Sequence, residues 1–236
     1  MKKAVVFDFG QTLADSADGF RRAEREAQLE IFSHIGVPSW EDFQSHYRLT
    51  RKSFQERSDF SRKAMWIEVC RHFGVSAELA FFVEQEGRYW DTVEEHTKIF
   101  PETMDTLERL RLKYRLAVIT NTQGQANSSR HRLWRFPDME KFFERIIVAG
   151  KSGIPPKPDP LPFRLCLEGL GVLPENAAYV GDDLRIDIYG AIAVGIQPVW
   201  IKHYSVRRAW PDVSVHFPVI TSLDQLIMMD RIIFGV

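Results

Sequence analysis

Polar side chains stand at the ends of three short apolar runs of this 236-residue chain. They are Asp8, Thr120 and Asp182, and the runs are 4–7, 116–119 and 177–180. In an open parallel sheet, ligands bind beyond the carboxyl ends of the strands, so each side chain is a candidate for a polar ligand site. Asp and Thr also cap helices and form turns, which explains any one position taken alone. Three strand ends with the same chemistry favour one shared site.

The apolar runs themselves predict a parallel sheet. They are short and rich in β-branched residues, which is typical of strands buried on both faces. The runs 146–148 and 198–201 have the same character. Helix-period segments lie between the runs; one starts after Pro101 and another ends at Gly171, residues suited to the start and the end of a helix. The alternation predicts an α/β fold with a doubly wound, Rossmann-like parallel-sheet core.

A stretch between residues 15 and 96 interrupts this alternation. It holds no convincing strand run, and its apolar residues recur every four positions, which indicates amphipathic helices. The clearest repeat consists of Ala23, Ala27, Ile31 and Ile35. We therefore expect two domains, a Rossmann-like core formed by residues 1–14 and 97–236 and an all-α domain, residues 15–96, inserted into it.

Composition and charge exclude several classes of protein. There are 31 Lys and Arg residues against 32 Asp and Glu, so the formal net charge of -1 lacks the basic excess of a nucleic-acid-binding protein. The apolar stretches fall short of the roughly 18 residues that span a bilayer. Cys70 and Cys166 lie far apart, which favours a reducing compartment over a disulfide framework. We expect a soluble, cytoplasmic protein without a nucleic-acid or membrane partner.

Four segments, taken in their order along the chain, carry a family resemblance. They are Phe7–Ser16 (FDFGQTLADS), Thr120–Asn121, Lys157–Pro160 (KPDP) and Gly181–Asp187 (GDDLRID). Each segment alone is a weak signal, but their order and spacing resemble the four motifs of the haloacid dehalogenase-like (HAD) hydrolase superfamily. The helical insertion after the first motif resembles the C1-type cap of that superfamily.

The resemblance implies a phosphohydrolase that acts on a small phosphorylated substrate. Asp8 is then the nucleophile, which attacks phosphorus and forms an aspartyl-phosphate. Thr120 and Lys157 are the other implied catalytic residues, and together with Asn121 they bind the phosphoryl group. A carboxylate attacks a dianionic phosphate poorly unless cations cancel the repulsion, and Lys157 with a divalent metal ion could do so.

The implied cofactor is Mg²⁺. This ion prefers oxygen ligands and keeps several waters, so one or two carboxylates and a substrate phosphate suffice to bind it. By resemblance, its protein ligands are Asp8, Asp182 and the backbone carbonyl of Gly10. Asp187 and Asp183 stand behind these ligands, Asp187 orienting a metal-bound water or the lysine and Asp183 acting there or as a helix N-cap.

Gly10 is the main departure from the family pattern. HAD phosphatases carry a second Asp two residues after the nucleophile, which protonates the leaving oxygen and then activates water. Gln11 also replaces the Gly usual in that turn. Losing general acid–base help costs about 10² to 10⁴ in rate. We expect a slow phosphatase, or one whose substrates need no protonation, such as aryl, acyl or anomeric phosphates, unless Asp15, a cap residue or a water replaces the acid.

Three alternatives remain open. A 2-haloacid dehalogenase also lacks the second acid, although the intact acidic segment 182–187 disfavours it because dehalogenases need no metal. A phosphonatase would need a cap lysine, for which Lys52 and Lys63 are candidates. A catalytically weak HAD protein could instead bind a phosphorylated ligand without turnover. The sequence does not identify the substrate or the oligomeric state.

Overall fold

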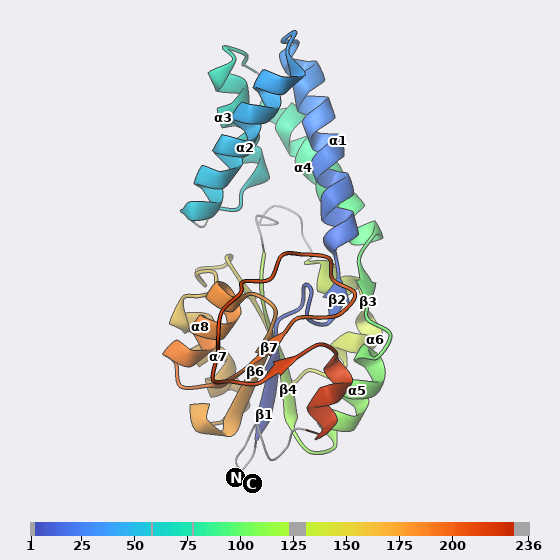
Figure 1. The fold of residues 1–236 in the computed structure, drawn as a ribbon, viewed down its shortest axis with the longest axis vertical. Helices are drawn as coiled ribbons and strands as arrows, with labels where there is room; N and C mark the ends of the chain where they lie inside the picture. Colours follow the sequence, from blue (N-terminus) through green and yellow to red (C-terminus); the bar gives the residue numbers. More distant parts are fainter. Residues whose placement is uncertain (1–2, 58, 77, 123–130, 229–236) are drawn as a thin grey trace. The chain divides into compact units, whose positions relative to one another are not determined.

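The computed structural model describes residues 3–57, 59–76, 78–122 and 131–228. These residues form two compact units, which we call the core unit and the helical unit. In the described ranges the core unit comprises residues 3–17, 97–122 and 131–228, and the helical unit comprises residues from Asp18 to His96. Figure 1 labels most of their helices and strands.

A six-stranded sheet in the order β5-β4-β1-β6-β7-β8 forms the centre of the core unit. Its strands are β1 (Ala4–Phe7), β4 (Arg115–Asn121), β5 (Arg145–Ala149), β6 (Ala177–Gly181), β7 (Gln197–Ile201) and β8 (Val219–Ile220). All neighbouring pairs are parallel. Strand β1 lies between β4 and β6, with Phe7 in register with Val118 and Val180. The carboxyl ends of these three strands therefore meet at one edge of the sheet.

Helices cover both faces of this sheet. The main ones are α5 (Thr103–Arg111), α6 (Pro137–Glu140), α7 (Pro160–Leu170) and α8 (Tyr189–Ala193). Because side chains alternate along β1, Val5 and Phe7 join one buried cluster with Leu107 of α5, whereas Ala4 and Val6 join another with Phe163 of α7. The expected doubly wound α/β core is confirmed.

Besides the two-residue edge strand β8, two further short strands were not predicted from the sequence. They are β2 (Ala14–Asp15) and β3 (Lys98–Ile99), which pair antiparallel where the chain leaves the core unit and returns to it. The Thr103 hydroxyl donates to the Leu13 carbonyl at 2.8 Å and ties this crossing to α5. A two-residue strand has no detectable periodicity. The sequence therefore predicted only the boundaries between the two domains at this place, and not the strands.

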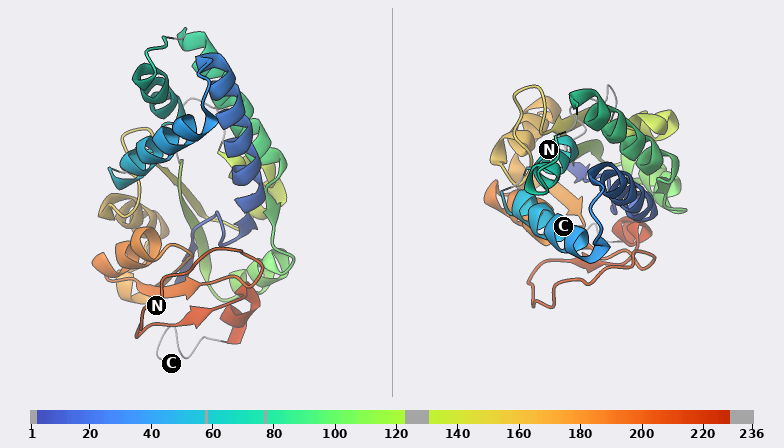
Figure 2. Two further views of the ribbon diagram at one scale, coloured as in Figure 1. Left: turned by 45° about the horizontal axis from the view of Figure 1, so that its top comes forward. Right: turned by 90° about the horizontal axis from the view of Figure 1, so that it is seen from above.

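The helical unit consists of four helices in its described residues (Figure 2). They are α1 (Ala17–Ile35), α2 (Trp40–Glu56), α3 (Arg62–His72) and α4 (Leu79–Glu95). Ser39 and Ser61 cap α2 and α3 by accepting hydrogen bonds from main-chain N–H groups of the first turn. The four-residue repeat of α1 is buried in a cluster that includes Trp66 and Trp90. None of the helices in the described ranges is long and apolar enough to cross a membrane.

Candidate active site

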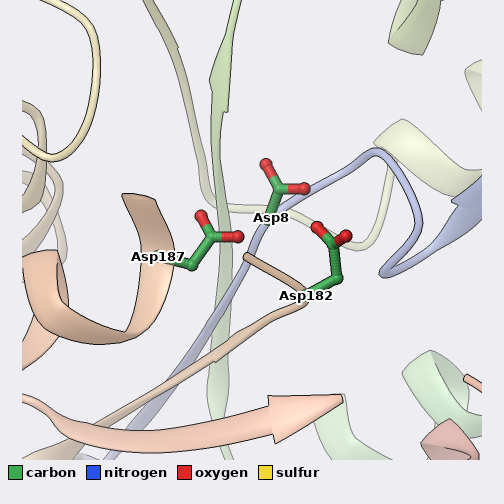
Figure 3. A group of neighbouring side chains, drawn as sticks. All are labelled: Asp8, Asp182 and Asp187. Atoms are coloured by element: carbon green, nitrogen blue, oxygen red, sulfur yellow. The ribbon is translucent and has the colours of Figure 1, made fainter. Parts of the chain in front are cut away.

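Three buried carboxylates converge at the carboxyl edge of the central strands. Asp8 directly follows β1, Asp182 directly follows β6, and Asp187 lies in the short π-helix Leu184–Ile188. Each offers an oxygen atom within 4.8 Å of the other two (Figure 3). Since β1 and β6 are hydrogen-bonded neighbours, their ends bring Asp8 and Asp182 together, while Asp187 is supplied by the helix that follows.

The local sequence positions Asp187 in two ways. Asp183 caps the π-helix, because its Oδ1 accepts hydrogen bonds from the N–H groups of Arg185 and Ile186 at 3.0 and 2.9 Å. Gly181 leaves room for the incoming side chain, since a Cβ atom at residue 181 would lie 2.4 Å from the Cβ of Asp187. The Asp187 Oδ2 atom in turn accepts from the Asp183 N–H at 3.0 Å. Any larger residue at position 181 would displace this carboxylate.

Lys157 places a positive charge among these carboxylates. Its Nζ lies 2.8 Å from Asp8 Oδ1 and 2.6 Å from Asp187 Oδ1. It also lies 2.8 Å from the Ile119 carbonyl and 2.7 Å from the Tyr179 hydroxyl. Burial alone would lower the pKa of this ammonium, but Asp187 and Asp8 outweigh burial and raise it. Lys157 is therefore a charged group held rigidly beside Asp8.

Thr120 and Asn121 are the last two residues of β4, which runs two residues further than the apolar run indicated. The Asn121 amide does not face open space, because both of its ends bond the main chain of Lys157. Thr120 Oγ1 lies 3.3 Å from Nε2 of His131. Both positions are buried, at 1% and 8% exposure for Thr120 and Asn121.

His131 controls the direction of the hydrogen bond to Thr120. Burial, and then the charges of Arg132 and Lys151, hold the pKa of this imidazole well below its usual range, so it is neutral. Its Nδ1 accepts a hydrogen bond from the Leu133 N–H at 3.1 Å, so the ring proton is on Nε2. Nε2 then donates to Thr120 Oγ1, and the Thr120 hydroxyl keeps its own proton to donate to another acceptor.

The carboxylates exceed the positive charges that face them. Arg208, from the segment after β7, pairs with Asp182, its Nη1 lying 2.5 Å from Oδ2. Even so, burial and then the charges of Asp187 and Asp8 raise the pKa of Asp182 well above its usual range. Burial also raises the pKa of Asp187 to about 6, although Lys157 opposes it. An all-oxygen cluster that is short of positive charge fits a hard divalent cation such as Mg²⁺.

Gly10 lies in the turn after Asp8, where it forms an isolated bridge with Ala14. A Cβ atom on this residue would lie 2.8 Å from Nη2 of Arg132, a buried residue of the 3-10 helix Arg132–Arg135. Gln11 adopts a left-handed conformation with φ of 58°, and its Oε1 accepts a hydrogen bond from the Ser16 N–H at 3.2 Å. Gln11 thus combines this side-chain hydrogen bond with a left-handed backbone conformation that glycine adopts more readily.

Sequence reasoning missed four residues near this site, namely Tyr179, His131, Arg132 and Arg208. Tyr179 had a signal, because its hydroxyl is the one polar group within the apolar run 177–180. His131, Arg132 and Arg208 lie outside every motif and every periodic segment, so only the fold brings them here. Of the predicted residues, Asp8, Lys157, Asp182 and Asp187 form one cluster, with Thr120 and Asn121 at the adjoining end of β4.

The fold and the site together define a doubly wound α/β protein with a carboxylate centre at its strand ends. The sequence pattern of the haloacid dehalogenase-like hydrolase family matches residues 2–195. The chain therefore belongs to the haloacid dehalogenase-like hydrolases, and the expected family membership is confirmed.

A protein of similar sequence agrees with this assignment, and two solved structures share the fold. Glyceraldehyde 3-phosphate phosphatase of Pyrococcus abyssi is 29% identical over 218 residues, which cover 86% of this chain and 82% of that protein. The structure of a HAD phosphatase from Thermococcus onnurineus matches with a TM-score of 0.65 and 24% identity over 97% of both chains. The 2-haloacid dehalogenase of Pseudomonas syringae pv. Tomato DC3000 matches equally well in fold, with a TM-score of 0.64, 24% identity, and 97% and 98% of the two chains covered.

Proposed function

We propose that this protein is a Mg²⁺-dependent phosphohydrolase that acts on a small phosphorylated metabolite through an aspartyl-phosphate on Asp8. The observation that carries the proposal is the fully buried Lys157, whose Nζ lies 2.8 Å from Asp8 Oδ1. A carboxylate that must attack a phosphate dianion needs positive charge beside it before the substrate arrives. Relatives such as the glyceraldehyde 3-phosphate phosphatase of Pyrococcus abyssi support phosphate esters as the substrate class.

The reaction divides into two displacements at phosphorus. In the first, an Asp8 carboxylate oxygen bonds to phosphorus and the bond to the leaving group breaks. In the second, water attacks phosphorus and releases phosphate, which restores the Asp8 carboxylate. Lys157 and the Thr120 hydroxyl bind phosphoryl oxygens, and Asn121 contributes by holding the main chain of Lys157 in place.

The Mg²⁺ ion would be held by Asp8, Asp182 and the Gly10 carbonyl, with Asp187 and Asp183 behind them. When bound, it neutralises the phosphoryl oxygens and the surplus charge of the carboxylates. The raised pKa of Asp182 supports this donor set, because the cause after burial is the charge of Asp187 and Asp8. The bond from Lys157 to Asp187 is in keeping with a supporting role for that carboxylate.

Two features of the chain remain part of the proposal. The helical unit would serve as a C1-type cap, residues 15–96, inserted between the first two motifs. The protein would work in a reducing, cytoplasmic compartment, since both of its cysteines lie in described helices as buried free thiols.

A 2-haloacid dehalogenase is the second candidate, because the enzyme from Pseudomonas syringae shares the fold. It would use Asp8 as a nucleophile towards carbon rather than phosphorus. The cluster of three buried carboxylates disfavours it, because a metal-independent reaction gives no reason for that concentration of negative charge.

The test is phosphate release from a panel of alkyl, aryl and acyl phosphates, with Mg²⁺ or with EDTA. We expect release that requires Mg²⁺ and that is abolished by Asp8→Asn. Halide release from 2-haloacids without metal would support the dehalogenase instead. Metal-dependent ligand binding without turnover of any compound would indicate a phospho-ligand-binding protein and contradict the proposal.

A further inference from the structure

A buried guanidinium is packed against the turn that follows the proposed nucleophile. Arg132 is 2% exposed, and its Cζ lies 5.4 Å from the centre of the Phe9 ring. Its Nη2 lies 2.8 Å from the point that a Cβ of residue 10 would occupy. A side chain at position 10, two residues after Asp8, would therefore project into space that the guanidinium of Arg132 occupies with its permanent positive charge.

The fold fixes Arg132 in this position. His131 precedes it and is bonded on one side to the Leu133 N–H and on the other to Thr120 Oγ1. Leu133, which follows it, is fully buried in the same cluster as Phe7 and Phe9. Arg132 is thus anchored on both sides by residues of the core unit, and its own side chain is buried beside Phe9.

The chemical consequence follows from the properties of the guanidinium. Its pKa lies far above neutrality, so it cannot donate a proton to a leaving group or act as a base. It can stabilise negative charge on oxygen, and such stabilisation is strong where burial excludes water. Gly10 contributes no side chain. A leaving group that departs next to residue 10 therefore meets the Arg132 cation, whereas in family phosphatases it meets an acid.

We propose that Arg132 is a catalytic residue that binds the leaving group as an anion, which makes acyl phosphates the preferred substrate class. The proposal rests on the proposed function and specifies its substrate. A carboxylate leaving group suits this site in two respects. It is stable without protonation at neutral pH, and its two oxygens match the fork of guanidinium N–H groups.

The reaction balances without a general acid. An Asp8 oxygen bonds to phosphorus, the bond between phosphorus and the acyl oxygen breaks, and the electron pair leaves with the carboxylate, which pairs with Arg132. Water then bonds to phosphorus, the bond from phosphorus to Asp8 breaks, and both water protons remain on the released dihydrogen phosphate. No proton has to reach the leaving group in either step.

The experiment measures kcat/KM with Mg²⁺ for acetyl phosphate and for a series of aryl phosphates that differ in leaving-group pKa. Wild type is compared with Arg132→Gln, which removes the charge, and Arg132→Lys, which keeps it on a shorter side chain. Arg135→Gln is the matched control, because Arg135 is exposed on the same 3-10 helix. Circular dichroism and Mg²⁺ titration check that each variant folds and binds the ion.

We expect wild type to prefer acetyl phosphate and Arg132→Gln to lose about 10²-fold in kcat/KM, with a loss that grows as the leaving-group pKa rises. Arg132→Lys is expected to lose less, and Arg135→Gln nothing.

An equal loss on every substrate, or the same dependence on leaving-group pKa in all variants, would overturn the role of Arg132 and leave the phosphohydrolase intact. If Arg132→Gln does not fold, the dependence of kcat/KM on leaving-group pKa in Arg132→Lys tests the role of Arg132 in the same way. No phosphate release by wild type from any substrate would overturn the proposed function and this assignment with it.

Discussion

The side-chain amide of Asn121 is hydrogen bonded at both ends to the main chain of Lys157. Its Nδ2 donates to the Lys157 carbonyl at 3.1 Å, and its Oδ1 accepts from the Lys157 N–H at 2.8 Å. The end of β4 therefore fixes the backbone from which the lysine reaches Asp8. A residue expected from the motif to bind phosphate is thus placed where it positions the cation that faces the nucleophile.

Replacing Asn121 should loosen that lysine. We expect Asn121→Ala to lower the free energy of unfolding by about 2 kcal/mol, because two buried main-chain groups of Lys157 lose their partner. Asn121→Asp keeps an acceptor for the Lys157 N–H but turns a buried carboxylate towards the Lys157 carbonyl, so we expect it to lose at least as much. Urea unfolding of the three proteins in EDTA measures the difference. Equal stability of Asn121→Ala and wild type would contradict this role of the amide.

Removing the lysine itself should expose the repulsion between the carboxylates. We expect Lys157→Met to lower the free energy of unfolding by about 3–5 kcal/mol at neutral pH, since one partner of a buried ion cluster is lost. The loss should shrink towards about pH 5, because Asp187, whose pKa is raised to about 6, can then take up a proton. Denaturant unfolding at both pH values, without metal, provides the measurement. A loss that does not change with pH would show that Lys157 contributes packing rather than charge.

The acidic cluster also predicts how Mg²⁺ binding depends on pH. The pKa of Asp187 rises from 3.8 to about 6 in the folded protein, so the folded state holds its proton more tightly than the unfolded state. That contribution to the stability of the metal-free protein is complete below about pH 4 and is lost as the pH rises through about 6. Mg²⁺ competes with the same proton. We expect the rise in Tm caused by Mg²⁺ to be small near pH 5 and larger near pH 7, as measured by thermal unfolding. An equal rise at both pH values would place the ion elsewhere.

Arg208 should weaken Mg²⁺ binding, because its guanidinium pairs with the proposed ligand Asp182. The Arg208 side chain is 36% exposed and lies over the Trp210 ring, with Cζ 4.5 Å from the ring centre. We expect Arg208→Gln to lower the Kd for Mg²⁺ by about tenfold, since a competing and repelling charge is removed. Calorimetric titration measures the Kd, with Arg207→Gln as the exposed neighbouring control. Weaker binding by Arg208→Gln would mean that the arginine assists the metal site.

The sequence was sufficient for the central strands of the sheet, β1, β4, β6 and β7, because they are buried on both faces. Apolar runs such as 4–7 and 177–180 match β1 and β6 closely, and the polar residue after each run lies at the site. The end of β4 was misjudged by two residues, because Thr120 and Asn121 are polar although the strand continues through them. Polarity marks the end of an apolar run, but hydrogen bonding to β5 decides where the strand ends.

The remainder of the site could not be read from the chain because it depends on packing between distant segments. Arg132 and Gly10 are 122 positions apart, and no periodicity connects them. Gly10 was noticed as a missing acid, but only the fold reveals that a guanidinium fills the space. Likewise, the ion pair of Arg208 with Asp182 comes from a segment without regular structure, in which neither helix nor strand periodicity exists to be detected.

Restoring an acid at position 10 is the sharpest test of the relationship between residue 10 and Arg132. In Gly10→Asp the new Cβ would lie 2.8 Å from Arg132 Nη2, so the guanidinium must shift and the added carboxylate lies beside it. We expect the two charges to pair, so that Gly10→Asp lowers kcat/KM for acyl phosphates by about tenfold or more and gains no activity on alkyl phosphates. Gly10→Ala supplies the same Cβ without the charge and separates crowding from pairing.

The double variant Gly10→Asp/Arg132→Gln should behave differently from either single variant. Without the guanidinium, the new carboxylate is released to act as a general acid, and activity on alkyl phosphates should exceed that of Gly10→Asp by about 10-fold to 100-fold. Kinetics of the four proteins form a double-mutant cycle, in which a coupling energy of about 1–3 kcal/mol is expected for groups in contact. If Gly10→Asp alone hydrolyses alkyl phosphates as fast as the double variant, Arg132 does not restrain the carboxylate, and the leaving group is selected elsewhere in the site.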